Sequence, residues 1–402
     1  MKVLHLSSSL KHDESERGIY PITHALMKAG HESIVIGAAD PSDELVLRFL
    51  RDGTQYYQLA MPKKSWLSLR HVFKLRQIIA HQKPDIVHVH SRTPAWVLHW
   101  ALRAMPTEDR PKIVAMFYGF YPLNSYTKVL FDADVIITAS HSIDTHLKTK
   151  LAAKKQELGV DRCDFDIVEV RRGVDVRKYP YRHHSSVHWL HSVFAQHPEL
   201  EHKKWLIFPT PIGHEYGHEW LIDVLGNLQD DYDNIHAIIM DDDFTNLSSQ
   251  DVSHEEFVQR LNALNLRHRV TFIGRRPTDT KEWLASANVV LCLANRPESI
   301  GMTALQAIHL GTPVIGWATG ASGDILTNLY PQGLIKQKKA IDLCKSVRYH
   351  LTNPLRPAMT HEYVVEQMIA ETLAVYQSLM PNCKLVYKDK HDHLVCIKAE
   401  ND

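Results

Sequence analysis

The chain has 402 residues, of which 44% are hydrophobic, 23% charged and 8% aromatic, a composition typical of folded globular proteins and not of disordered or collagenous ones. Its length favours two domains. The 46 Lys and Arg balance the 46 Asp and Glu. Because no overall positive charge attracts nucleic acid, we expect no nucleic-acid partner.

The five cysteines are scattered and show no C-x-x-C spacing, which predicts reduced thiols and neither a disulfide framework nor a zinc cage. The 27 histidines are also dispersed, so we expect no metal site. No resident cofactor is expected either. The N-terminus lacks the apolar core of a signal peptide, and no stretch reaches the length that spans a bilayer. We therefore expect a cytoplasmic protein.

Short apolar runs of β type alternate with longer amphipathic stretches throughout the chain, which is typical of βαβ units around a parallel sheet. Helices are expected at residues 19–28, 218–228, 255–265 and 362–380. Strands are expected in the first half at 2–6, 33–36, 86–89, 113–117 and 135–138, and in the second half at 205–208, 235–240, 270–273, 289–293 and 313–316.

This pattern predicts an α/β protein with two Rossmann-like, doubly wound domains in tandem. The polar stretch 177–186, which contains Pro180, is the expected linker. The expected domains are residues 1–185 and 186–360. Residues 361–402 are expected to form a helix and a tail. The sequence leaves open whether this segment packs back on the first domain and whether the tail adds an edge strand.

The first strand is followed by neither a G-x-G-x-x-G nor a Walker A sequence, so a nicotinamide cofactor on that loop is not expected. Gly18 stands directly before the first predicted helix and is the candidate substrate-binding residue of the N-terminal domain. The ligands of doubly wound sheets lie beyond the carboxyl ends of the strands, at helix N-termini that favour anions.

Residues 296–315, RPESIGMTALQAIHLGTPVI, are the most informative stretch. They predict a turn, a helix from about Met302 to Leu310, and a return to a strand. The backbone N–H groups of Gly301, Met302 and Thr303 would point from the helix start toward an anion, which the small Gly301 would let come close.

Two polar side chains flank this helix start. Glu298, on the preceding turn, would accept hydrogen bonds from sugar hydroxyls, and Gln306, one turn inside the helix, would reach polar groups of the same ligand. The alternative is an ordinary strand-turn-helix with a solvated glutamate.

These motifs resemble those of the family 4 retaining glycosyltransferases of GT-B fold, and more narrowly those that build bacterial lipopolysaccharide cores. The family pattern E-x7-E followed by G-T-P-V-I is matched at 298–315, with Gln306 in place of the second Glu. Five further landmarks fall in order: KAGHE at 28–32, KPDIVHVH at 83–90, FYGFY at 117–121, DVIITAS at 134–140 and RGVD at 172–175.

The resemblance implies two domains that face each other across a cleft, the first taking the acceptor and the second a nucleotide diphosphate sugar. It implies transfer of a hexose-like sugar with retention of configuration and without a metal. Cations and a helix N-terminus would stabilise the leaving diphosphate. The implied acceptor is a surface glycan such as a lipopolysaccharide core, or a lipid-linked glycan.

Several positions depart from the family pattern. Pro211 and Tyr216 stand where the family has the Arg and Lys that hold the diphosphate, and Tyr118 stands where it has a His that contacts the donor sugar. These losses leave two hypotheses open. The chain is an active transferase with Glu298 and Tyr118 in the catalytic site, or a catalytically degenerate partner or scaffold for another glycosyltransferase.

Other cations could replace the Arg and Lys that Pro211 and Tyr216 displace, and the candidates are Arg296, Arg275, Arg276, His214 and His218. The alternative for each of them is an ordinary charged residue on the surface. The carboxylates of residues 241–243 would offer a divalent-ion site in place of these cations, although a solvated acidic loop is the more common explanation.

Residues 61–84 carry six Lys or Arg and no acidic residue, with helical spacing from Trp66 onward. Leu69, Val72 and Phe73 fall on the apolar side of this helix. Such a helix would lie on the anionic inner leaflet as a peripheral contact, or pack as an ordinary Rossmann helix with membrane contact limited to Lys63, Lys64 and Trp66.

Overall fold

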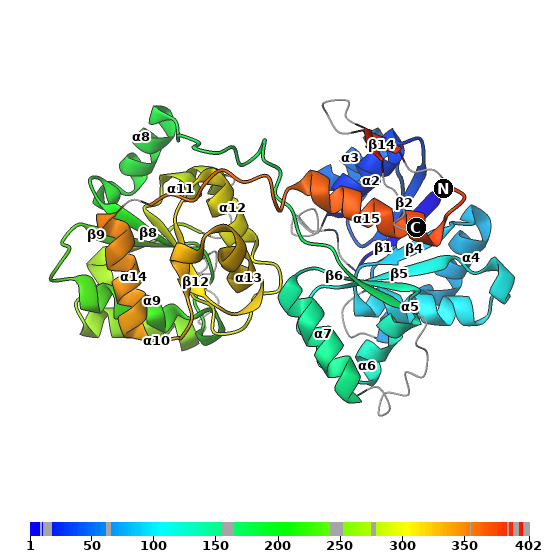
Figure 1. Ribbon diagram of the computed structural model, residues 1–402, viewed down its shortest axis with the longest axis horizontal. Coiled ribbons are helices and arrows are strands. Elements are labelled where there is room, and N and C mark those ends of the chain that lie inside the picture. The colour runs from blue at the N-terminus through cyan, green and yellow to red at the C-terminus, as the bar shows by residue number, and fades with distance from the viewer. Residues whose placement is uncertain are drawn as a thin grey trace. The chain divides into compact units, whose positions relative to one another are not determined.

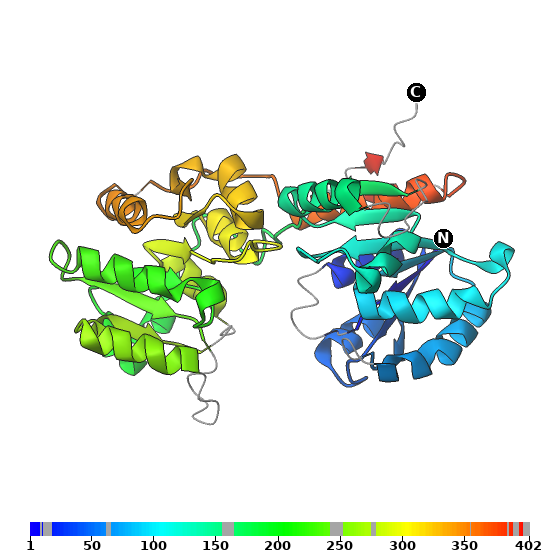
Figure 2. The same ribbon diagram turned by 90° about the horizontal axis from the view of Figure 1, so that it is seen from below.

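The computed structural model describes residues 1–8, 10, 18–61, 66–154, 165–241, 252–274, 279–353, 355–383, 386–388 and 394–396. The chain forms two compact units (Figure 1). Unit 1 comprises Met1–Gly173 and Tyr363–Asp402, and unit 2 comprises Val174–Glu362. Each unit has a parallel sheet with helices on both faces (Figure 2).

The sheet of unit 1 has seven parallel strands in the order β3-β2-β1-β4-β5-β6-β7. Its central strands are buried on both faces, as their near-continuous apolar sequences predict. The strands are β1 (Lys2–Leu6), β2 (Glu32–Gly37), β3 (Gln55–Gln58), β4 (Ile86–Val89), β5 (Lys112–Phe117), β6 (Val135–Thr138) and β7 (Asp166–Glu169).

The last long helix of the chain belongs to unit 1. Figure 1 shows α15 beside α2, and the two helices are in contact. The helices of unit 1 are α2 (Ile19–Lys28), α3 (Glu44–Arg51), α4 (Val72–Gln82), α5 (Arg92–Arg103), α6 (Ser125–Lys128), α7 (His141–Lys154) and α15 (Val365–Leu379).

The sheet of unit 2 has six parallel strands in the order β10-β9-β8-β11-β12-β13. They are β8 (Lys204–Phe208), β9 (Ile235–Ile239), β10 (Val270–Phe272), β11 (Val289–Cys292), β12 (Val314–Trp317) and β13 (Leu334–Ile335). The helices are α8 (Val187–Gln196), α9 (His218–Leu228), α10 (Val252–Ala263), α11 (Thr280–Ser286), α12 (Met302–Leu310), α13 (Gly320–Leu329) and α14 (Ala340–Thr352).

The stretch expected to be a linker is packed on unit 2. The N–H of Arg182 donates to the carbonyl of Leu310 at 3.1 Å, and the Tyr181 hydroxyl donates to the carbonyl of Pro357 at 2.9 Å. The ring of Tyr181 also lies against Gly311. Because Tyr181 and the backbone of Arg182 anchor this segment to unit 2, the division between the units falls after Gly173 and not near residue 185.

The C-terminal tail forms a separate two-stranded antiparallel sheet of β14 (Val386–Lys388) and β15 (Leu394–Cys396) and does not extend the large sheet of unit 1. The basic segment near residue 70 forms a 3-10 turn, Trp66–His71, followed by α4. Helix α4 buries Leu75, Ile78 and Ile79, whereas the side chain of Phe73, expected on the buried side, is 64% exposed. Among the described residues, no helix has the length and apolarity required to cross a bilayer.

Candidate functional site

The strand order of unit 2 places a topological switch point between β8 and β11. These strands are neighbours, but the chain leaves β8 toward β9 and leaves β11 toward β12. Loops that follow such diverging strands open a crevice at the carboxyl edge of the sheet, where doubly wound folds bind ligands. Residues 209–217 follow β8 and residues 293–301 follow β11.

The second of these loops leads into α12, which begins at Met302 as the sequence predicted. Gly301 is its N-cap with φ of 66°. Within the described residues, no side chain caps this helix start, and its first turn contains no acidic residue. Met302 and Thr303 are half-buried there. Uncapped N–H groups and the positive end of the helix dipole together favour an anion at this position.

Glycine is required at position 301 for reasons of packing as well as backbone conformation. A Cβ atom there would lie 2.8 Å from the backbone nitrogen of Ser322. Gly320, with φ of 66°, is equally confined, because its Cβ would lie 2.6 Å from the backbone N and O of Glu298. The start of α13 is therefore packed directly against the loop that carries Glu298.

Glu298 is held from α13. Its side chain accepts a hydrogen bond from the Ser322 hydroxyl, and its backbone carbonyl accepts one from the N–H of Ala321 at 2.8 Å. The residue is half-buried instead of solvated, which corrects the simplest sequence interpretation. Burial raises the pKa of the Glu298 carboxyl, and the Ser322 hydrogen bond opposes this rise by favouring the charged form.

The loop after β8 is stabilised by Asp241. This carboxylate is 1% exposed and accepts a hydrogen bond from the N–H of Ile212 at 2.9 Å. Asp241 therefore has a structural partner, whereas Asp242 and Asp243, the rest of the candidate ion site, lie outside the described residues. Pro211 and Tyr216 are half-buried on the same loop.

Two of the candidate replacement cations lie at this edge with carboxylate partners. The Arg296 guanidinium is 2.5 Å from a Glu215 carboxylate oxygen, and its side chain is 79% exposed. His214 Nδ1 is 3.2 Å from Glu219 Oε1. Arg275 and Arg276 lie outside the described residues, so the structure does not place them.

A further cation at this site, Lys338, was not predicted from the sequence. Its ammonium donates to the carbonyls of Ala294 and Asn295 at 3.1 and 2.8 Å, so the charge lies beside the loop between β11 and α12. Burial lowers the pKa of Lys338. The residue follows β13, far in sequence from the motif at 296–315, and only the strand order brings the two together.

The remaining predicted residues divide between the units. Gln306 is on α12 of unit 2 and is 7% exposed. His218 is buried at the start of α9. Tyr118 and Gly18 belong to unit 1, where Gly18 is the N-cap of α2 with φ of 85°. Tyr118 is 5% exposed, and its hydroxyl is 3.3 Å from His90 Nδ1, in the interior of unit 1.

His90 belongs to a cluster at the switch point of unit 1, between β1 and β4. Its Nε2 is 3.1 Å from Nδ1 of His5, and the third member, His88, has Nδ1 2.5 Å from the Tyr376 hydroxyl of α15. All three imidazoles are buried. Burial lowers the pKa of His5 to about 3 and that of His88 well below its usual value, so both are neutral at pH 7.

Comparison with known families gives two matches in succession. Residues 15–160 match the model of "Glycosyltransferase Family 4", and residues 192–367 match that of "Glycosyl transferases group 1". A 2-deoxystreptamine N-acetyl-D-glucosaminyltransferase of Streptomyces fradiae is 27% identical over 122 residues. That match covers 30% of this chain and only 28% of the Streptomyces protein.

Solved structures resemble the chain over nearly its whole length. A glycosyltransferase from Rickettsia africae ESF-5 has a TM-score of 0.76 at 17% identity and covers 95% of this chain and 99% of its own. Anabaena HepE in complex with UDP and glucose has a TM-score of 0.72 at 17% identity, and the match covers 94% of this chain and 100% of HepE. The lipopolysaccharide outer core galactosyltransferase WaaB has a TM-score of 0.62 at 14% identity, and the match covers 95% of this chain and 98% of WaaB. These likenesses establish the two-sheet GT-B fold.

Proposed function

Because the chain belongs to the family 4, group 1 glycosyltransferases of GT-B fold, we propose that it transfers a sugar from a nucleotide diphosphate sugar, with retention of configuration, to a surface-glycan acceptor such as a lipopolysaccharide core. Unit 2 takes the donor and unit 1 the acceptor. The likeness to Anabaena HepE in complex with UDP and glucose supports a nucleotide-sugar donor, and the likeness to WaaB supports this acceptor class.

One observation carries the proposal: the uncapped start of α12 and the carboxylate of Glu298 lie on one loop at the switch point of unit 2. The N–H groups of Met302 and Thr303 bind the diphosphate, and Glu298 accepts hydrogen bonds from the donor sugar. Gln306 takes the ribose. Donors aimed at the charge that develops on the leaving diphosphate lower the barrier most effectively.

Lys338 contributes the cation that Pro211 and Tyr216 do not provide. Its charge is held beside the β11–α12 loop, and one of its three N–H protons remains for a phosphate oxygen after the two carbonyl contacts. Arg296 is the second candidate cation, provided that a phosphate displaces Glu215 from its guanidinium. His214, Arg275 and, in unit 1, Gly18 are further substrate-binding candidates.

The acceptor side includes a surface that fits an anionic membrane. Phe73 on α4 is 64% exposed and Trp100 on α5 is 40% exposed, and these two helices pack together. Arg70 and Lys74 are exposed beside Phe73. Exposed aromatic rings among cations are typical of peripheral binding to anionic lipid, and a lipid-linked acceptor would be presented at the inner face of the membrane.

A transfer assay tests the reaction itself. The protein is incubated with UDP-, GDP- and ADP-sugars and a lipopolysaccharide-core oligosaccharide, and the product is analysed by NMR. We expect one donor to be consumed and the new glycosidic linkage to keep the configuration of the donor. An inverted linkage would contradict retention, and no transfer from any donor would contradict the activity with this acceptor.

The second candidate function is a catalytically degenerate partner or scaffold for another glycosyltransferase. The observations that favour it are the missing cations at Pro211 and Tyr216 and the carboxylate partners of Arg296 and His214. In cells that lack the gene, glycan output should then be restored by a Glu298→Ala variant as fully as by the wild type. Loss of restoration at unchanged protein level would exclude the scaffold function.

A further inference from the structure

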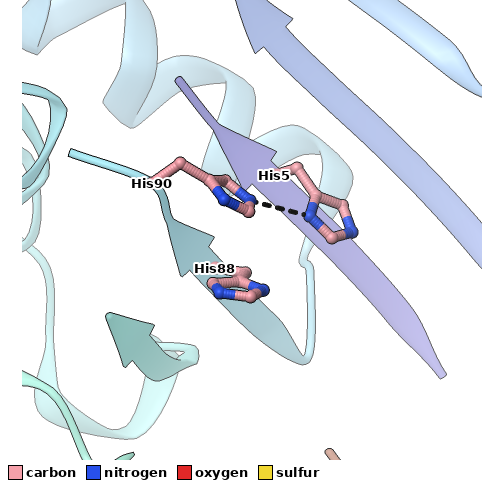
Figure 3. A group of neighbouring side chains, drawn as sticks. All are labelled: His5, His88 and His90. Atoms are coloured by element: carbon pink, nitrogen blue, oxygen red, sulfur yellow. Dashed lines mark hydrogen bonds between the residues drawn. The ribbon is translucent and has the colours of Figure 1, made fainter. Parts of the chain in front are cut away.

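The buried histidines of unit 1 have the donor set of a metal centre. His88 and His90 are two residues apart on and just beyond β4, so their side chains point to the same face of the sheet. His5 on β1 pairs directly with His88 in the strand register. Figure 3 shows the three rings gathered over these two neighbouring strands.

One pair of ring nitrogens has the spacing of two ligands on a single small ion. One ring nitrogen from each histidine lies within 4.8 Å of those of the other two, and this is the group of three metal-ligating side chains that the described residues contain. His5 Nδ1 and His90 Nε2 are 3.1 Å apart. Two imidazoles on one tetrahedral zinc ion, with bonds of about 2.0–2.1 Å, have nitrogens about 3.3 Å apart.

The surroundings orient two of the three ligands, His88 and His90. The second nitrogens of His88 and His90 lie 2.5 and 3.3 Å from the hydroxyls of Tyr376 and Tyr118. Metal-bound histidines commonly donate their second N–H to such an oxygen, which fixes the tautomer and directs the other nitrogen at the ion. His88 Nε2 is buried without a hydrogen-bond partner in the described part of the chain.

We propose that His5, His88 and His90 bind a divalent transition-metal ion of the zinc class through His5 Nδ1, His88 Nε2 and His90 Nε2. The ion replaces the hydrogen bond between His5 and His90, and His5 keeps its proton on Nε2. Three neutral imidazoles suit zinc, cobalt or nickel better than magnesium or calcium, which prefer oxygen. A fourth coordination position remains for water.

The sequence predicted no metal site, because His5 and His90 are 85 residues apart and follow no short ligand motif. Strand pairing alone brings them together. The centre would join β1 and β4 at the switch point of unit 1 and, through the Tyr376 hydroxyl, link them to α15.

Cobalt titration tests the proposal without reference to transferase activity. The full chain is stripped with a chelator, and Co²⁺ is added while the visible absorption and the stoichiometry are recorded. We expect one Co²⁺ per chain with the intense visible bands of tetrahedral coordination. Zn²⁺ should displace the cobalt and raise the Tm, because an ion that binds only the folded state stabilises it.

Three variants locate the ion. His88→Gln should abolish the tetrahedral spectrum, and Tyr376→Phe, which keeps every ligand, should weaken binding 10- to 100-fold. His236→Gln, which removes a buried histidine of unit 2, should bind as the wild type does. A wild type without the tetrahedral spectrum, or a spectrum that persists in His88→Gln, would overturn the proposal. If His88→Gln does not fold, unchanged affinity in Tyr376→Phe would overturn it instead.

Discussion

In unit 1, the strands β1 and β4, which diverge at the switch point, carry His5 and His88 into the interior. In unit 2, the corresponding strands β8 and β11 are apolar, and the loops that follow them carry Glu215 and Glu298. The first switch point is lined by buried imidazoles and tyrosine hydroxyls. The second presents an uncapped helix start, carboxylates and Lys338.

One sheet construction therefore carries two different sets of side chains, and the loops and a few residues at the strand ends supply them. An uncapped helix start with a nearby ammonium favours phosphate. Buried imidazoles clustered on two adjacent strands favour a transition metal. Because the difference resides in single residues, substitutions can break it in one unit and leave the other unchanged.

The largest effect is expected at Glu298. Glu298→Gln keeps the shape and the Ser322 contact but removes the negative charge, so transfer should fall roughly 100-fold, about 3 kcal/mol, as for other lost polar contacts in active sites. Its pKa is raised in the folded state, so the buried charge costs stability above that pKa, and the variant should melt at or above the wild-type Tm at pH 7. Kinetics and calorimetry check both.

The control for this variant is Glu201→Gln, which removes an exposed carboxylate of the same unit. It should change neither turnover nor Tm. Full activity in Glu298→Gln would exclude a role for the charge of this carboxylate in transfer.

The second effect is a loss of stability in acid that originates in unit 2. His236 is buried, and its Nε2 is 2.8 Å from the Thr271 hydroxyl. Burial lowers its pKa from 6.5 to about 4, so its contribution is complete above pH 6.5 and is lost as the pH falls through that window. The difference between these two pKa values corresponds to about 3 kcal/mol in the free energy of unfolding.

Urea unfolding of wild type and His236→Gln at pH 7 and pH 4 measures this contribution. The stability of the variant should depend less on pH over this range by about the same amount. If the stability of the two proteins depends equally on pH, burial does not lower the pKa of His236 in the folded protein.

The third effect is the difference in stability loss between two glycine substitutions. One adds a steric clash at the candidate site, and the other adds backbone strain alone. Gly320 and Gly30 both have positive φ, 66° and 78°, but a Cβ on Gly30 meets nothing within 4 Å. Gly30→Ala should cost roughly 1–2 kcal/mol from backbone strain alone. Gly320→Ala should cost about 2 kcal/mol more, because the new methyl displaces the loop of Glu298. Equal losses in denaturant unfolding would refute the packing argument.

The smallest effect is expected at Lys338. Lys338→Met keeps the length of the side chain and removes its charge, so donor affinity should fall about tenfold, or 1.4 kcal/mol. Lys345→Met on the exposed side of α14 is the matched control and should bind as the wild type does. Competition binding with a fluorescent nucleotide measures the difference. Tighter binding in Lys338→Met would exclude the cation role.

Local sequence pattern predicted most of the fold, including α12 to the residue, because βαβ alternation and the glycines at both ends of that helix are short-range signals. Beyond the expected strands, the structure adds β3, β7, β13 and β15, which are short or partly polar. The mixed exposure of α4 was also missed, since helical spacing alone does not show which side a neighbouring helix covers.

The candidate site was predictable only in part. The position of Glu298 before α12 followed from the motif, but its contact with Ser322 did not, because the two residues are 24 positions apart and meet only when β12 and α13 pack. Lys338 and the histidine cluster depend on strand order in the same way. Side chains that meet through tertiary pairing leave no periodic trace in the sequence.

The proposed function requires that unit 2 bind a nucleotide sugar at the β11–α12 loop. Isothermal titration of the full chain with UDP-, GDP- and ADP-sugars, with Glu298→Gln in parallel, tests it most directly. We predict saturable binding of one donor per chain that is weaker in Glu298→Gln. If no nucleotide sugar binds, or if the donor binds both proteins equally, the β11–α12 loop of unit 2 is not the donor site.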